Sequence, residues 1–144
     1  MNYIFIGLKE HLVDGIAPRV GEDLIKKGIL TKEQCFFCHG MNIDEIYEQT
    51  KDLKCIAIDI MMIKEDKPIL FLNTGIKPAN KLREQSKVLG NKSIVINTKH
   101  VYGKDMDWKE CLLKDYRDKD VEKRVKLLET ITEYMIKAFL EGND

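Results

Sequence analysis

Five short apolar runs follow one another along the chain, with polar or amphipathic segments between them. They cover residues 2–7, 35–39, 55–61, 68–73 and 93–97 and are rich in Ile, Val, Phe and Leu. Most are continuously apolar rather than alternating, which is typical of strands that are buried on both faces of a sheet.

Apolar residues recur at helical spacing in the segments between and after these runs. The pattern predicts helices over residues 17–28, 42–53, 80–90 and 121–140. The first and third end on Gly28 and Gly90, and glycine is the residue most favoured just after a helix. The last is a long amphipathic helix, which we expect to pack on the sheet in a structural role, after a solvated charged connection at 114–124.

The alternation of strands and helices predicts an α/β fold. We expect a three-layer αβα sandwich around a mixed, mostly parallel five-stranded sheet, in a phosphorylase- or hydrolase-like arrangement. The polar turn 64–67 is short enough for a hairpin, so one strand should be antiparallel. No repeat or Ser/Pro-rich linker interrupts the pattern, which predicts a single domain over residues 1–144.

The charge balance restricts the classes of partner. The chain carries 24 basic and 24 acidic residues, so its net charge is zero and neither sign forms a long block. Direct nucleic-acid binding and attraction to an anionic membrane are therefore not expected. The N-terminus lacks a secretory pattern, and no apolar run approaches the roughly 20 residues of a membrane span. We expect a soluble cytoplasmic protein.

The four cysteines fit that compartment as reduced thiols. The stretch CFFCH at 35–39 matches a c-type haem attachment pattern and half of a zinc site. Without an export signal or a second close Cys/His pair, a buried strand is the better interpretation. We predict no cofactor and no bound metal.

Two aspartates stand where chemistry is expected in such a sheet. Asp14 follows the first strand and precedes the first helix, and Asp59 lies near the carboxyl end of the third strand. Ligands of open α/β sheets bind outside the carboxyl ends of the strands, and strands one and three are often neighbours. The two carboxylates could therefore face one crevice.

Each aspartate also has a structural explanation. Asp14 is a good helix N-cap residue, and such caps contribute about 1 kcal/mol without any catalytic role. Asp59 sits in the apolar run CIAIDIMM (55–62), where a charged carboxylate costs several kcal/mol unless it is paired, hydrogen-bonded or protonated. The sequence leaves both explanations open.

Three short motifs occur in order along the chain: DGIAPRV (14–20), AID (57–59) and TGIKP (74–78). Together they resemble the bacterial germination protease family, which cleaves small acid-soluble spore proteins and includes a short sporulation-associated branch. The resemblance runs from about residue 2 to residue 100 and includes the final helix. The wider fold resembles hydrogenase-maturation endopeptidases, which use acidic residues to recognise nickel.

The resemblance implies that Asp14 and Asp59 are two catalytic aspartates that hydrolyse a peptide bond. The loop after TGIKP is shorter than in the proteases, and the nickel-recognising histidine is absent unless His100 substitutes for it. Two carboxylates held close together would share one proton, so that one could accept a proton from water while the other donates. The roles within the pair are not assigned by the sequence.

Further residues are candidates to hold a peptide backbone near the pair. They are Asn73, Thr74, Gly75, Lys77 and Asn80. As alternatives, the first three are turn residues and the lysine is a solvated side chain. His11 and His39 are better explained by local hydrogen bonds than by ligand binding.

Three functions remain open at this stage. The first is an endopeptidase of sporulation or germination, acting on a protein or peptide, with small acid-soluble spore proteins as the candidate substrate, in the cytoplasm or spore of a spore-forming bacterium. The second is a catalytically silent relative that binds a peptide in the same crevice. The third is a metal-assisted maturation peptidase. The sequence allows a homo-oligomer but does not specify one.

Overall fold

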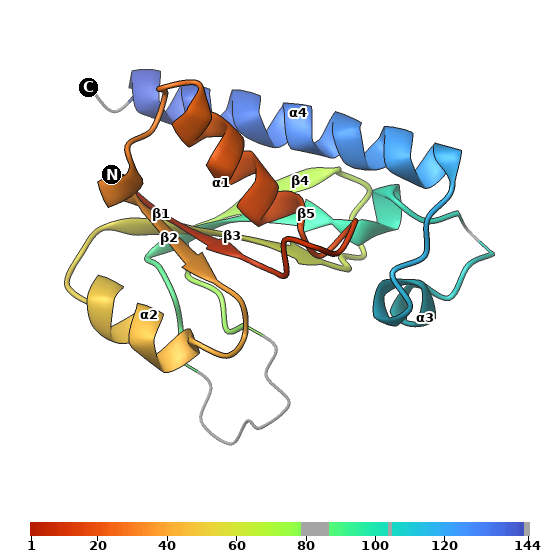
Figure 1. Cartoon of the computed structure of the whole chain (residues 1–144), viewed down its shortest axis with the longest axis horizontal. Helices are drawn as coiled ribbons and strands as arrows, with labels where there is room; N and C mark the ends of the chain where they lie inside the picture. The colour runs from red at the N-terminus through yellow and green to blue at the C-terminus, as the bar shows by residue number, and fades with distance from the viewer. Residues whose placement is uncertain (79–86, 104, 143–144) are drawn as a thin grey trace.

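The structure is a computed structural model that describes residues 1–78, 87–103 and 105–142 (Figure 1). Its strands are β1 (Asn2–Ile6), β2 (Cys35–Cys38), β3 (Cys55–Met61), β4 (Ile69–Leu72) and β5 (Lys92–Asn97). Its helices are α1 (Ile16–Lys26), α2 (Ile43–Thr50), α3 (Trp108–Leu113) and α4 (Lys119–Gly142), with short 3-10 turns η1 (Lys32–Gln34) and η2 (Thr98–His100).

The predicted strands and three of the four predicted helices are confirmed. The helix predicted over 80–90 is not confirmed: residues 79–86 lie outside the described residues, and residues 87–90 are not helical. There Leu89 forms an antiparallel bridge with Ile76, and Gly90 has a φ of 78°. The side chain of Leu89 is fully buried. Its apolar character therefore reflects packing beside the bridge to Ile76 and not one face of a helix.

The sheet has the strand order β2-β1-β3-β5-β4, and all its pairs are parallel except β4 with β5. One antiparallel strand is therefore confirmed, but the hairpin between the third and fourth strands is wrong, because β5 lies between them. The side chain of Asn97, at the end of β5, holds the connection that leads from β3 past β5 to β4. It donates to the carbonyls of Glu65 (2.9 Å) and Lys67 (3.0 Å) and accepts from the backbone N–H of Ile63 (3.2 Å).

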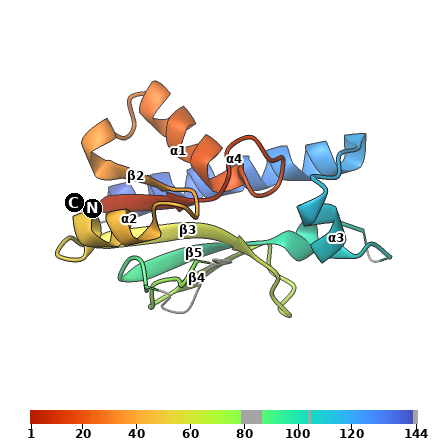
Figure 2. The ribbon, with the colours of Figure 1, turned by 60° about the horizontal axis from the view of Figure 1, so that its bottom comes forward.

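Helices cover both faces of the sheet, as Figures 1 and 2 show. Alternate strand residues divide the core into two clusters, one on each face. The face under α1 and α4 receives Tyr3, Phe5, Ile56, Ile58, Ile94 and Ile96, and the face on the side of α2 receives Ile4, Ile6, Ala57 and Val95. The predicted three-layer αβα sandwich is confirmed, and α3 lies beyond one end of the sheet (Figure 2).

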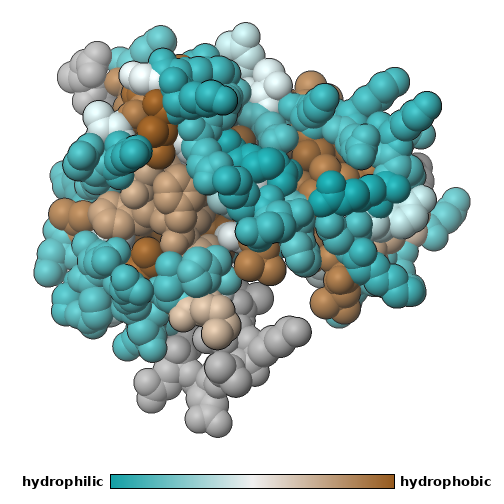
Figure 3. Space-filling view, in the orientation of Figure 1, coloured by the Kyte–Doolittle hydropathy of each residue, from teal (hydrophilic) through white to brown (hydrophobic). Residues whose placement is uncertain are grey.

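Helix α4 is amphipathic along its whole length. Its buried residues are Val121, Val125, Leu128, Thr132 and Ile136. The opposite side is mostly charged, with Leu127 and Tyr134 as exposed exceptions. Polar side chains cover much of the face seen in Figure 3, with apolar ones in smaller areas. No helix within the described ranges is both long enough and apolar enough to cross a membrane.

Helix α1 approaches the sheet closely because residue 21 is a glycine. A Cβ at this position would lie 2.6 Å from the ring of Phe5, which is fully buried in β1. Such a contact is too short to tolerate, and a ring packed on all sides has little room to move. Gly21 therefore sets the distance between α1 and β1.

We expect Gly21→Ala to destabilise the protein by about 1–3 kcal/mol, the usual effect of overpacking a core. Urea unfolding followed by circular dichroism measures this. Gly142→Ala is the matched control, because a Cβ there would have no neighbour within 4 Å. Equal stability of the two variants would contradict the prediction.

Candidate active site

The loop between β1 and α1 folds back on the end of the strand, and this places Asp14. Gly7 ends the strand with a φ of 145° and donates its N–H to the carbonyl of Cys38 at 2.9 Å. A side chain at Gly7 would collide with the carbonyl oxygen of Asp14. Only glycine fits both the backbone angle and this close approach.

The Asp14 carboxylate binds the start of its own loop. Its Oδ2 accepts a hydrogen bond from the backbone N–H of Leu8 at 2.8 Å. The N-cap residue of α1 is Gly15, and no side chain caps the helix there. The helix-cap explanation of Asp14 is therefore wrong, since the carboxylate stabilises the exit of β1 instead.

Asp59 lies inside the sheet. It is paired with Val95 of β5, is only 9% exposed, and accepts the backbone N–H of Ile60 at its Oδ1 (2.8 Å). Burial raises its pKa well above the usual range, and the Ile60 N–H lowers it only in part. The carboxyl at this position therefore favours its neutral, protonated form.

The two aspartates come within electrostatic range of each other. The charge of Asp14 is a further cause of the raised pKa of Asp59. The pKa of Asp14 is itself raised by burial, against the opposing effects of the Leu8 N–H and of His11. Because Asp14 is half-buried and Asp59 is buried, we infer that Asp14 ionises first and that Asp59 retains its proton.

Three of the predicted contact residues, Asn73, Thr74 and Gly75, do not lie beside this pair. Because β4 runs antiparallel, its end lies beside the start of β5, where Ser93 Oγ donates to the carbonyl of Thr74 at 2.8 Å. A side chain at Gly75 would collide there with the carbonyls of Leu89 and Gly90. Asn73, Thr74 and Gly75 thus lie at the amino ends of the parallel strands, away from Asp14 and Asp59.

Two more of these candidates gain no support for a role at the site. Lys77 has an exposed side chain, and Asn80 lies outside the described residues. Their predicted role as peptide contacts is not tested by these positions. For all five of these residues it stays a prediction.

Sequence reasoning missed several groups near Asp14 and its loop. Tyr102, just after η2, is 7% exposed, and its hydroxyl has no hydrogen-bond partner within the described part of the chain. Burial and the neighbouring Cys111, Asp115 and Asp14 raise its pKa to about 12. Asp115 and Arg19 also bind the loop that carries Asp14. Only Arg19 had a signal, as a member of the motif DGIAPRV.

Two cysteines and one histidine that the sequence singled out lie in structural positions. Cys35 and Cys38 are buried free thiols of β2, which confirms the buried-strand interpretation of CFFCH. His100 Nε2 lies 3.0 Å from the carbonyl of Asp66, in the connection between β3 and β4. Among the residues described, no group of three or more His, Cys, Asp or Glu side chains could hold a metal ion.

Comparisons with known proteins do not assign a family. No family model and no curated protein sequence matches this chain. Among solved structures, it is similar to the [NiFe] hydrogenase maturation protease HybD from Thermococcus kodakarensis. The TM-score is 0.41 and the identity 14%, over 94% of this chain and 99% of that chain. At this level of similarity, the fold assignment rests on the strand order and layers described above, and the resemblance to germination proteases stays a prediction.

The raised pKa of Asp59 predicts a specific dependence of stability on pH. The folded protein keeps a proton that an unfolded aspartate releases above about pH 4. The stability that this proton contributes is complete below about pH 4 and is lost as the pH rises through the folded-state pKa. An asparagine in place of Asp59 cannot ionise but keeps an oxygen for the Ile60 N–H.

We therefore expect Asp59→Asn to gain stability relative to the wild type as the pH rises from about 4 to 8, because the wild type progressively loses the contribution of the retained proton. Urea denaturation at a series of pH values measures the difference. Asp52→Asn, at an exposed position, is the control and should follow the wild type. Parallel curves for Asp59→Asn and the wild type would show that Asp59 titrates normally.

A second prediction concerns the coupling within the pair. Asp14→Asn removes the negative charge that opposes ionisation of Asp59, so the pKa of Asp59 should fall. Carbon-13 NMR of the Asp59 carboxyl during a pH titration measures it. An unchanged Asp59 titration would mean that the two carboxyls do not interact.

Proposed function

We propose that this protein is a hydrolase that cleaves peptide bonds with the acid pair Asp14 and Asp59. The observation that carries the proposal is the difference between the two carboxyls. A buried Asp59 with a strongly raised pKa lies in range of a half-buried Asp14. Two titratable groups whose environments separate their pKa values are the usual arrangement of a general acid and a general base.

The environments also suggest which residue does which. Asp14, the member that ionises first, would accept a proton from water as the water oxygen attacks the peptide carbonyl carbon. Asp59 would donate its proton, first hydrogen-bonding the carbonyl oxygen and then passing the proton to the amine nitrogen as the C–N bond breaks. Asp14 then carries the proton taken from water. Transfer of this proton from Asp14 to Asp59 restores the starting protonation state of the pair.

The resemblance to germination proteases supplies the biological setting of the proposal. On that basis the substrate is an extended protein segment, such as a small acid-soluble spore protein, and the setting is sporulation or germination inside the cell or spore. The three motifs 14–20, 57–59 and 74–78 support this setting. A chain without net charge also fits a peptide substrate better than a polyanionic one.

Binding of a peptide without cleavage is the second candidate. Two features favour it. Each carboxyl already accepts a hydrogen bond from a backbone N–H at one of its oxygens, and Asp59 is only 9% exposed. In that case the pair would be part of a binding surface at the carboxyl ends of β1 and β3. The two candidates differ in whether a bound peptide is hydrolysed.

We expect Asp14→Asn and Asp59→Asn each to lower the rate of peptide cleavage by about 10²–10⁴-fold, the usual contribution of a general acid or base. The measurement is mass spectrometry of small acid-soluble spore proteins incubated with each purified protein. Circular dichroism verifies that each variant is folded, and the exposed Asp52→Asn serves as the control with wild-type activity.

The outcomes separate the candidates. Cleavage that persists in both variants would remove the acid pair from the mechanism. Absence of cleavage by the wild type, with saturable binding of the same proteins in a calorimetric titration, would favour the binding function.

A further inference from the structure

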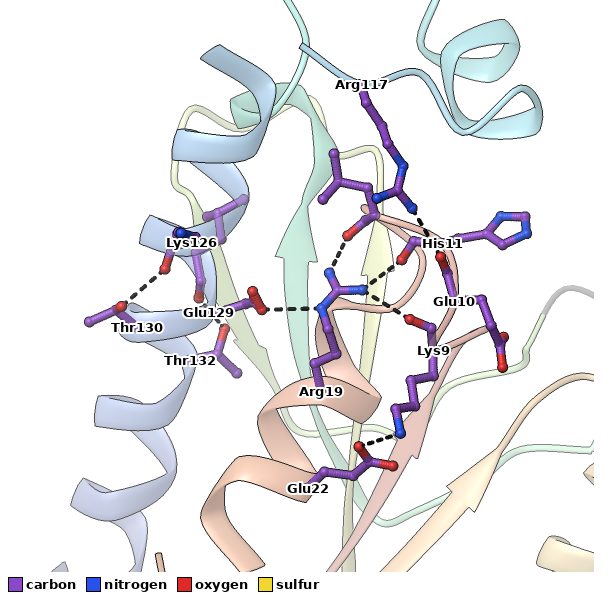
Figure 4. A network of polar contacts seen from close by, with 12 residues as sticks. Lys9, Glu10, His11, Arg19, Glu22, Arg117, Lys126, Glu129, Thr130 and Thr132 are labelled. Atoms are coloured by element: carbon purple, nitrogen blue, oxygen red, sulfur yellow. Dashed lines mark hydrogen bonds and ion pairs between the residues drawn. The ribbon is translucent and has the colours of Figure 1, made fainter. Parts of the chain in front are cut away.

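Three backbone carbonyls of the loop that carries Asp14 surround the guanidinium of Arg19 (Figure 4). Arg19 Nη1 donates to the carbonyls of Lys9 (3.1 Å) and His11 (2.7 Å), and Nη2 donates to the carbonyl of Leu12. Three carbonyls within four residues thus point at one charge. A planar guanidinium is suited to this, because its N–H groups diverge in a fixed fork.

The cation is itself held by helix α4. Arg19 Nε lies 3.4 Å from Glu129 Oε2, and the two side chains are 27% and 24% exposed. With this contact, four of the five N–H groups of the guanidinium are used. Arg19 therefore has little freedom to move without releasing the loop.

The connection between α3 and α4 holds the other side of the same loop. Asp115 Oδ1 accepts the backbone N–H of Leu12 at 2.7 Å, and its Oδ2 binds Arg117, which in turn donates to the carbonyl of Glu10 at 3.0 Å. Asp115 adopts a φ of 52°, a left-handed backbone conformation that is uncommon for a residue other than glycine. The contacts around it keep it in that conformation.

Gly15 shows that the space around the cation is fully used. Its backbone is not left-handed, with a φ of −88°, so the angle does not require glycine. A Cβ there would collide with Arg19 Nη1 and the His11 carbonyl, and would lie 2.6 Å from the Lys9 carbonyl. The glycine after Asp14 is therefore needed to make room for the cation and its carbonyls.

Asp14 lies between these fixed points. Leu12, bound through both its carbonyl and its N–H, precedes it by two residues, and Gly15 follows it directly. Its carboxylate closes the loop on the N–H of Leu8. A rotation of the loop about Arg19 would therefore move this carboxylate relative to Asp59, which is fixed in the sheet.

We propose that Arg19 is a positioning residue, which acts through the carbonyls of Lys9, His11 and Leu12 to hold the Asp14 carboxylate beside Asp59. This inference rests on the proposed function, because the pair must be the site for its positioning to matter. Arg19 touches neither carboxylate of the pair in the described contacts and does not take part in the chemistry. It sets the distance across which the two acids interact.

The test uses Arg19→Lys, which keeps the positive charge but has one nitrogen and three N–H groups in place of the planar fork, so it cannot serve the three carbonyls and Glu129 together. Carbon-13 NMR titration of the Asp59 carboxyl reads the interaction with Asp14, independently of any peptidase activity. We expect the proton affinity of Asp59 to fall at least about threefold, since a displaced Asp14 opposes its ionisation less. Amide hydrogen exchange at Leu8 should become faster as its bond to Asp14 is lost.

Lys27→Gln is the matched control. Lys27, the C-cap residue of α1, forms ion pairs with Asp23 (2.8 Å) and with Glu133 of α4 (3.3 Å), so it joins the same two helices, and neither ion pair involves the loop. This variant should leave the Asp59 titration and the Leu8 exchange unchanged. Glu129→Gln is a milder variant that weakens the support of Arg19, and it should shift the Asp59 titration in the same direction. It replaces Arg19→Lys in the test if that variant does not fold.

The outcomes are distinct. If Arg19→Lys or Glu129→Gln lowers stability but leaves the Asp59 titration unchanged, Arg19 is only structural and the inference is overturned. If the titration shifts and cleavage slows through kcat with KM retained, both the inference and the proposed function are supported. If the titration shifts but the wild type cleaves no peptide, the positioning role stands and the peptidase function fails.

Discussion

A carboxyl group buried in the middle of a hydrophobic sheet is the constraint around which this structure is arranged. Asp59 has apolar neighbours before and after it in β3 and Val95 beside it in β5, and its carboxyl accepts a hydrogen bond from the next residue in the chain. A charge in this environment would be costly, and the simplest relief is to keep the proton. A nearby second carboxylate adds to that preference, so the two acids differ in their affinity for a proton even though they are chemically identical.

The position of the second acid depends on glycines and on one arginine. Gly7 lets the Asp14 backbone lie against the end of β1, and Gly15 leaves room for the guanidinium of Arg19. Hydrogen bonds from α1 and from the α3–α4 connection then hold the loop. Elements from both ends of the chain therefore converge on one short loop. Loops that carry functional residues commonly need this kind of support, because precise geometry requires a rigid surrounding.

The strand order decides which loops meet at the candidate site. With β5 between β3 and β4, the carboxyl ends of β1, β2, β3 and β5 share one edge, and β4 contributes its beginning there instead of its end. The segment after β4 is thereby directed to the opposite edge. This explains how the motif TGIKP can follow the other two motifs in sequence while its first residues lie apart from Asp14 and Asp59 in space.

Local patterns were sufficient for much of the fold. The apolar runs gave five strands, helical spacing gave α1, α2 and α4, and the place of Asp14 and Asp59 at strand ends followed from the alternation of elements, because burial period and strand direction are local properties. Three features were not predictable in this way. They are the pairing of β4 with β5, the bridge between Leu89 and Ile76, and the bond of Asp14 to Leu8 in place of a helix cap. Each depends on which distant group occupies the space nearby: Asn97 beside the β3–β4 connection, Ile76 opposite Leu89, and the N–H of Leu8 within reach of Asp14. Long-range contacts of this kind, including the guanidinium of Arg19 among three carbonyls, arise only when the layers pack, since neither spacing nor composition encodes a distance between remote residues.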